Sequence, residues 1–148
     1  MHRISLATGL AVVSASAVVA TAFAAVSTSG VAAQWEPLTE YPTFVAEFDA
    51  ASVHPNGGLL EATFRFTHSQ PQTNVDSGLK YLSAQVQSLF DCDGKRFAPF
   101  RRVEFAGPKG TGKEIAEVVV PPSKVKLDNV VPESMNGVMF NRVCAKRQ

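Results

Sequence analysis

Apolar side chains alternate with polar ones on both sides of a turn-forming segment, and this pattern restricts the fold of the chain most. Residues 54–58 (HPNGG) contain Asn-Gly and Gly-Gly pairs, which adopt positive φ angles at little steric cost. Before this turn the apolar positions are Phe44, Ala46 and Phe48, and after it they are Leu60, Ala62, Phe64 and Phe66. A period of two is typical of half-buried strands. Residues 43–52 and 60–67 are therefore predicted to pair as an antiparallel hairpin.

Three further segments have the composition of strands, at residues 81–92, 96–105 and 114–120. The Asp93-Gly94 pair predicts a hairpin turn between the first two of them. Pro99 cannot donate a hydrogen bond within a sheet, so it confines the second to a sheet edge or a β-bulge.

Other segments are expected to be irregular. Residues 34–42 contain two prolines and predict an irregular edge, and residues 69–78 crowd Pro, Asn, Asp and Gly into a predicted loop. Residues 107–113 predict a flexible connection.

The C-terminal part of the chain has a helical period. Its apolar positions are Met135, Val138, Met139 and Val143, and Pro132 before them suits the first position of a helix. A glycine inside a helix, here Gly137, weakens it by about 1 kcal/mol relative to alanine. The sequence thus predicts an α+β fold, with an antiparallel sheet of about five to six strands and a C-terminal α-helix.

Residues 1–33 have the pattern of a secretory signal peptide. Arg3 precedes an uncharged run at residues 4–26, and small residues at 27–33 suit cleavage after Ala33, with cleavage after Ala24 as the competitor. The run is also long enough for an uncleaved membrane anchor. Small and hydroxyl residues interrupt it and no basic stop follows, so we predict cleavage and no membrane span in the mature chain.

Residues 34–148 then form one domain of ordinary size. Arg3 is the only charged residue removed, so basic and acidic residues balance at 13 each in the mature chain. This balance argues against a nucleic-acid partner, because such partners select strongly basic surfaces.

Cys92 and Cys144 are predicted to form one disulfide, since an exported chain meets an oxidising environment. A thioredoxin-like redox centre would need a Cys-x-x-Cys spacing, which the sequence lacks. A zinc site would need further ligands, and the mature chain has only His54 and His68, without metal-site spacing. We therefore predict a helix pinned to the sheet by Cys92–Cys144, and no metal.

Two motifs suggest catalysis or nucleotide binding only superficially. Residues 107–113 (GPKGTGK) match the start of a phosphate-binding loop, but Glu114 replaces the Ser or Thr that ligates Mg²⁺ and a strand pattern follows instead of a helix. His54 and His68 have no nucleophile motif nearby. We predict no enzyme activity and no cofactor.

Four basic residues gather around one predicted strand: Lys95, Arg96, Arg101 and Arg102. Strand alternation predicts that Arg96 and Arg102 share one face, and that Lys95 and Arg101 share the other. They are candidate binding residues for a protein or an acidic glycan. The alternative is that they keep a sheet edge soluble and deter edge pairing.

Several motifs in the second half resemble the bacterial surface-adhesin E-like family, over roughly residues 42–145. The motifs are Tyr81-Leu-Ser83 leading into Phe90-Asp-Cys92, then Arg96, the Gly107/Gly112 loop, Val130-Val-Pro132-Glu-Ser134 and Val143-Cys144. The resemblance implies an antiparallel sheet, a C-terminal helix and a disulfide. It also implies a Gram-negative bacterial origin and, for the namesake group, attachment to host surface or matrix proteins. The adhesive type is a lipoprotein, and no cysteine lies near the cleavage site here.

Two functions follow as expectations. The first is an exported, noncatalytic, adhesin-like binding domain that recognises a protein or glycan partner. The alternative is a periplasmic structural or accessory protein of the cell envelope with no host ligand. We expect the periplasm as the location, with the medium or the cell surface as the alternative, and we leave a homodimer open.

Overall fold

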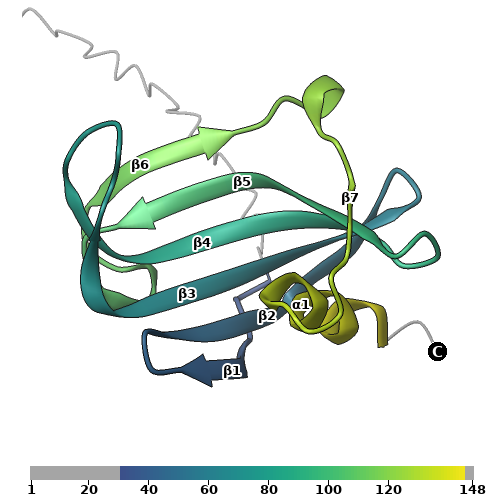
Figure 1. The fold of residues 1–148 in the computed structure, drawn as a ribbon, viewed down its shortest axis with the longest axis horizontal. Helices are drawn as coiled ribbons and strands as arrows, with labels where there is room; N and C mark the ends of the chain where they lie inside the picture. The colour runs from purple at the N-terminus through teal and green to yellow at the C-terminus, as the bar shows by residue number, and fades with distance from the viewer. Residues whose placement is uncertain (1–30, 146–148) are drawn as a thin grey trace, which may run out of the picture. The chain divides into compact units, whose positions relative to one another are not determined.

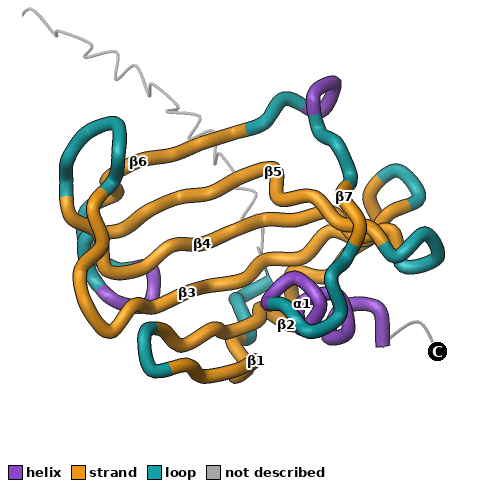
Figure 2. Tube along the Cα trace, in the orientation of Figure 1, coloured by secondary structure: helices purple, strands orange, loops and turns teal. Residues whose placement is uncertain are grey.

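The computed structural model describes residues 31–145, which contain one antiparallel β-sheet and one α-helix (Figures 1 and 2). The strands are β1 (Trp35–Tyr41), β2 (Phe44–Asn56), β3 (Leu59–Thr73), β4 (Lys80–Asp91), β5 (Arg96–Phe105), β6 (Glu114–Val119) and β7 (Asp128–Asn129). The helix is α1 (Met135–Cys144), and two short 3₁₀ turns are η1 (Pro108–Gly110) and η2 (Pro122–Lys124). The predicted signal peptide lies almost wholly outside the described residues. No described helix is long and apolar enough to cross a membrane.

The sheet follows the order of the sequence. Strands β1 to β6 are neighbours in chain order, and short β7 pairs with β5 beside β6. Sequential antiparallel neighbours need only short connections, as the turn signals predicted. The predicted α+β fold, with a C-terminal helix and a disulfide, is confirmed.

The β2–β3 hairpin has the predicted turn and register. Gly57 and Gly58 have φ angles of 56° and 83°, which a residue with a Cβ rarely adopts. Phe48 lies opposite Phe64, so both rings point to the same face of the sheet. The predicted loop at 69–78 is wrong in extent, because β3 continues to Thr73, which lies opposite Lys80.

The two faces of the sheet are different. The helix face carries Phe48, Phe64 and Phe90 and is packed against α1, and the back face carries Arg65. On the back face Arg65 bonds to Glu47 at 2.8 Å and lies over the Trp35 ring at 4.1 Å. Residues 34–42, predicted to be an irregular edge, instead form strand β1, with a register shift between Pro37 and Thr39.

The glycine-rich segment at 107–113 folds onto the back face. Arg65 Nη1 donates to the carbonyl of Lys109 at 3.0 Å, and the Gly110 N–H donates to Ser83 Oγ at 2.8 Å. Ser83 Oγ in turn donates to the carbonyl of Gly107 at 2.7 Å. These long-range hydrogen bonds hold the segment in place, so the expectation of a flexible connection is wrong. The strand predicted after it is β6.

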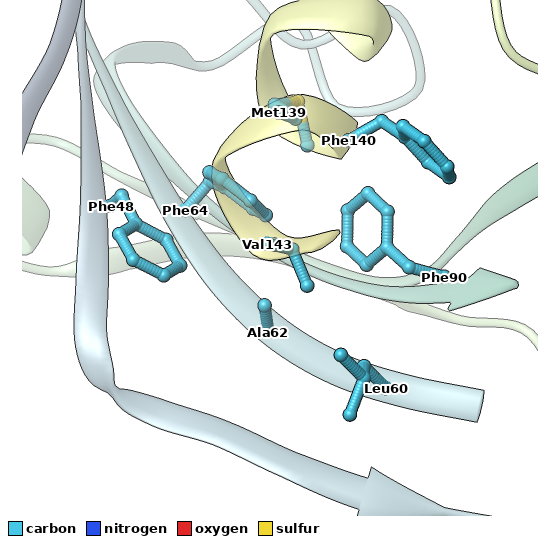
Figure 3. Packing of buried hydrophobic residues seen from close by; sticks show 8 residues of the cluster. All are labelled: Phe48, Leu60, Ala62, Phe64, Phe90, Met139, Phe140 and Val143. Carbon is cyan, nitrogen blue, oxygen red and sulfur yellow. The ribbon is translucent and has the colours of Figure 1, made fainter. Parts of the chain in front are cut away.

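The core lies between the helix face and α1 (Figure 3). Its buried members are Phe48, Leu60, Ala62, Phe64, Phe90, Met139, Phe140 and Val143. Figure 3 shows Val143 pointing toward Ala62 and the Phe140 ring lying beside Phe90. The disulfide Cys92–Cys144 joins the end of β4 to the end of α1, with 5.6 Å between the Cα atoms. The predicted disulfide is therefore confirmed.

The start of the helix differs from the prediction. Ser134, not Pro132, precedes the first turn, and its side chain accepts from the Gly137 N–H as an N-cap. Gly137 is buried, and a Cβ there would lie 2.2 Å from the carbonyl oxygen of Pro132. Gly137 thus permits a close approach between the incoming chain and α1, a role that helix propensity does not show.

Candidate binding groove

A groove of about 590 Å³ lies on the helix face beside the core. Its residues come from β3 and β4 (Phe66, Val86, Ser88), from β5 and β6 with the residue after β6 (Phe97, Pro99, Phe100, Arg101, Arg102, Val118, Val120) and from the start of α1 (Ser134, Met135, Asn136, Met139). The lining is mainly apolar. Its size falls within the range of about 300–1,000 Å³ typical of ligand sites.

The groove exists because α1 covers only part of the helix face. Figure 1 shows α1 in front of β2 and β3, while the chain from η2 through β7 crosses in front of the strands toward one end of the sheet on its way to α1. The disulfide holds the C-terminal end of α1 at the end of β4. The helix is 10 residues long, about 15 Å at 1.5 Å per residue, so it leaves β6 and the part of β5 beyond Phe97 uncovered.

A bulge in β5 shapes the groove wall. Gln87 lies opposite Arg101 whereas Ser88 lies opposite Pro99, so Phe100 is an extra residue. The bulge that Pro99 predicted is thus present, and Pro99 lies where β5 pairs with neither β6 nor β7. Phe97, Phe100 and Arg102 all line the groove as a result.

Ser88 places a hydroxyl among the apolar groove residues. Its side chain is fully buried, and its Oγ has no hydrogen-bond partner among the described residues. An unpaired buried hydroxyl costs roughly 1–3 kcal/mol. The Ser88 hydroxyl is thus covered by its neighbours, and the accessible surface of the groove stays mainly apolar.

Polar side chains border the groove on the side away from α1. Arg102 Nε donates to Glu104 Oε1 at 2.9 Å, and Arg102 Nη2 donates to Tyr81 Oη at 3.2 Å. Asn74 Nδ2 donates to the other carboxylate oxygen of Glu104 at 2.9 Å. The charge of Arg102 is thus offset by buried Glu104, so this border is close to neutral.

His68 lies next to this border. Its ring contacts Phe44 and Tyr81, with centroids 6.3 and 5.7 Å apart, and its Nε2 is buried without a hydrogen-bond partner among the described residues. Burial lowers the pKa of His68 below its usual 6.5, and the nearby Arg102 charge lowers it further, while Glu104 opposes them. The imidazole is therefore held neutral near pH 7.

The structure does not bring the four predicted binding residues together. Arg96 pairs with Asp91 beside the β4–β5 turn at 2.6 Å, and Lys95 lies in that turn with φ of 52°. Arg101 pairs with Glu117 at 2.6 Å on the back face, while Arg102 lies on the helix face. The predicted sharing of a face by Arg96 and Arg102 is wrong, because the bulge at Phe100 reverses the alternation.

The histidines are not arranged as a catalytic pair. His54 Nδ1 lies 2.8 Å from the carbonyl of Ser52, and its Nε2 lies 3.5 Å from Glu61 Oε2. Both cysteines form the disulfide. Residues 31–145 contain no group of three or more His, Cys, Asp or Glu side chains that could hold a metal ion. The absence of catalysis and of a metal stays a prediction.

Sequence reasoning missed the groove. The sequence pattern places Val118 in a strand and Met135 in a helical stripe, whereas Val118 is 54% exposed and Met135 lines the groove. The apolar residues at 118–120 were a usable signal, because a strand that exposes valines on both faces has no neighbour to cover them.

Comparisons with known proteins agree on the fold. The family profile of surface-adhesin protein E matches residues 35–145. Crystal form II of Haemophilus influenzae protein E superposes with a TM-score of 0.54 at 10% sequence identity, covering 78% of this chain and 98% of that chain. Protein E from non-typeable Haemophilus influenzae gives a TM-score of 0.55 at 11% identity, covering 79% of each chain. Among curated proteins, none matches the chain.

At these identities the superpositions show the fold alone, and the family is shown by the profile. That profile covers the whole sheet, the helix and both cysteines. The chain belongs to the surface-adhesin protein E family.

Proposed function

We propose that this protein is an exported, noncatalytic, adhesin-like binding module, and that the groove on its helix face contacts the partner. The observation that carries the proposal is an apolar groove of about 590 Å³ in a member of an adhesin family. Apolar surface left in water costs free energy, roughly 25 cal/mol per Å², which a partner recovers on binding.

The lining favours a protein over a glycan. Glycans present hydroxyl and acidic groups, whereas the groove offers Val118, Phe100 and Met135. Two arginines belong to the lining, and each is offset by a carboxylate, Arg101 by Glu117 and Arg102 by Glu104. The four basic residues stay candidates for contacts at the margin, and Lys95 and Arg96 at the β4–β5 turn are the most exposed of them.

The first test is location. Cells that produce the full chain are fractionated, and mature protein beginning near Gln34 is sought in periplasm, medium and membrane. Protein on the surface or in the medium supports adhesion. A purely periplasmic pool contradicts it and favours the envelope accessory role.

The second test is binding to immobilised extracellular-matrix proteins, with heparin as the glycan arm. Val118→Asp places a charge in the groove, and Val75→Asp is the matched control, because Val75 is 93% exposed in the β3–β4 loop. We expect Val118→Asp alone to weaken binding to a matrix protein, by about tenfold or more. Equal binding by wild type and Val118→Asp would exclude the groove. Sedimentation of the same samples reports whether the protein forms a homodimer.

A further inference from the structure

Strand β6 ends the sheet beside the groove. Within residues 31–145 it pairs with β5 on one side, and its other backbone edge is free. The edge strand on the opposite side, β1, contains Pro37 and a register shift, and both features deter pairing with another chain. β6 contains no proline, and its register with β5 is regular from Ala116 to Val119.

The free edge of β6 presents unused backbone groups. Val120 donates its N–H toward β5, to the carbonyl of Phe100 at 2.7 Å. Backbone groups of successive residues in an antiparallel strand point alternately to its two sides. Val119 and Glu117 therefore direct their N–H and C=O groups away from β5, to the free edge.

Side chains alternate between the two faces at the same edge. Val118 and Val120 line the groove on the helix face. Val119 and Glu117 point to the back face, where Glu117 is paired with Arg101 and is 40% exposed. The groove and the free edge are thus continuous through Val118.

We propose that β6 accepts an extended segment of a protein partner as an additional strand, with every second side chain of that segment entering the groove. The proposal rests on the proposed function and gives the conformation and chemistry of the partner. Main-chain hydrogen bonds to Glu117 and Val119 supply affinity, and the groove selects side chains, as in other cases of strand addition.

The chemistry of the two faces defines the segment. Side chains opposite Val118 meet the apolar groove and are valine, leucine or similar. Side chains on the back face meet the exposed carboxylate of Glu114 and that of Glu117, whose charge Arg101 offsets. Opposite charges across strands are favourable, so the position that faces Glu114 is lysine or arginine. The partner segment therefore alternates apolar with polar residues and carries a basic residue opposite Glu114.

The test uses the mature chain and a fluorescein-labelled octapeptide that alternates valine with lysine. Val119→Pro removes an N–H that faces solvent, a position where edge strands tolerate proline. Val119→Thr is the matched control, because it keeps the N–H and the β-branch. We expect Val119→Pro to weaken peptide binding about tenfold or more, since backbone pairing at the edge is lost, and Val119→Thr to change it less than about twofold.

A second experiment uses the wild-type protein and modified peptides. It tests strand addition even if Val119→Pro does not fold. In the added strand, every second amide faces β6 and the others face away from it. N-methylation of the amides that face β6 is expected to abolish binding, and methylation of the others is expected to be tolerated. Failure of the unmodified peptide to bind overturns the proposal. Binding that ignores both Val119→Pro and methylation also overturns it, because side chains alone would then dock in the groove.

The two proposals fail separately. If a matrix protein binds wild type and Val119→Pro equally, strand addition is wrong and the binding function stands. If the peptide binds in a methylation-sensitive way but the cell retains the protein in the periplasm without a host partner, strand addition stands and the adhesive function is wrong.

Discussion

The two parts of the helix face have the same kind of strand sequence but different surroundings. Over β2, β3 and β4 the rings of Phe48, Phe64 and Phe90 are fully buried under α1. Over β5 and β6, Phe100 is half-buried and Val118 is exposed in the groove. Both parts carry apolar side chains on the helix face, although Arg102 and Glu104 occupy that face after the bulge in β5. The comparison teaches that an apolar pattern identifies a face of the sheet, and that the extent of the helix decides whether this face becomes core or open groove.

The largest expected effect comes from the disulfide, which holds α1 over the part of the sheet that the helix covers. Replacing Cys92 and Cys144 together with serine opens a link across 52 residues, which stabilises by about 4 kcal/mol through loop closure. We expect the free energy of unfolding in urea to fall by about that amount. A change below about 1 kcal/mol would mean that packing alone holds α1 on the sheet.

A pair of phenylalanines measures the difference between the two parts directly. Phe140→Ala removes a buried ring that packs against Phe90, and we expect a loss of about 3 kcal/mol in unfolding free energy. Phe100→Ala, in the groove, should cost only about 1 kcal/mol, because water already reaches part of the ring. Equal losses in urea denaturation would contradict the distinction between core and groove.

Gly137 tests how the helix meets the chain that precedes it. Helix propensity predicts that Gly137→Ala stabilises by about 1 kcal/mol. The added Cβ would lie 2.2 Å from the Pro132 carbonyl oxygen, so we expect a net loss of about 2 kcal/mol from overpacking. Thermal unfolding gives the sign, and a rise in Tm would show that residues 131–132 can move away from α1 at little cost.

The smallest expected effect is a pH dependence of the unfolding free energy, which comes from His68 next to the polar border of the groove. The pKa of His68 is lowered in the folded protein, mainly by burial, so the unfolded chain binds more protons just below pH 6.5. Stability should therefore decrease as the pH falls below 6.5, until the folded-state pKa is reached. His68→Gln should reduce this slope in urea titrations at pH 7.5 and 5.5, and an unchanged slope would assign it to another group.

The candidate site was predictable only in pieces. The β5 bulge followed from Pro99, but its position at Phe100, which reverses the alternation and separates Arg96 from Arg102, did not. A bulge can form at several positions near a proline, and the neighbouring strands select among them. The four basic residues therefore form a cluster in the sequence, but the fold places them at separate sites.

The sequence by itself determined strands β2 to β6, the β2–β3 turn and the disulfide. Each depends on a local property, such as a period of two, a Gly-Gly pair or two cysteines in an exported chain. Tertiary structure alone decided the groove, the anchoring of residues 107–113 on Arg65 and Ser83, and the role of Gly137. These depend on the packing of segments far apart in the chain, and the periodicity of one segment carries no information about how far another will cover it.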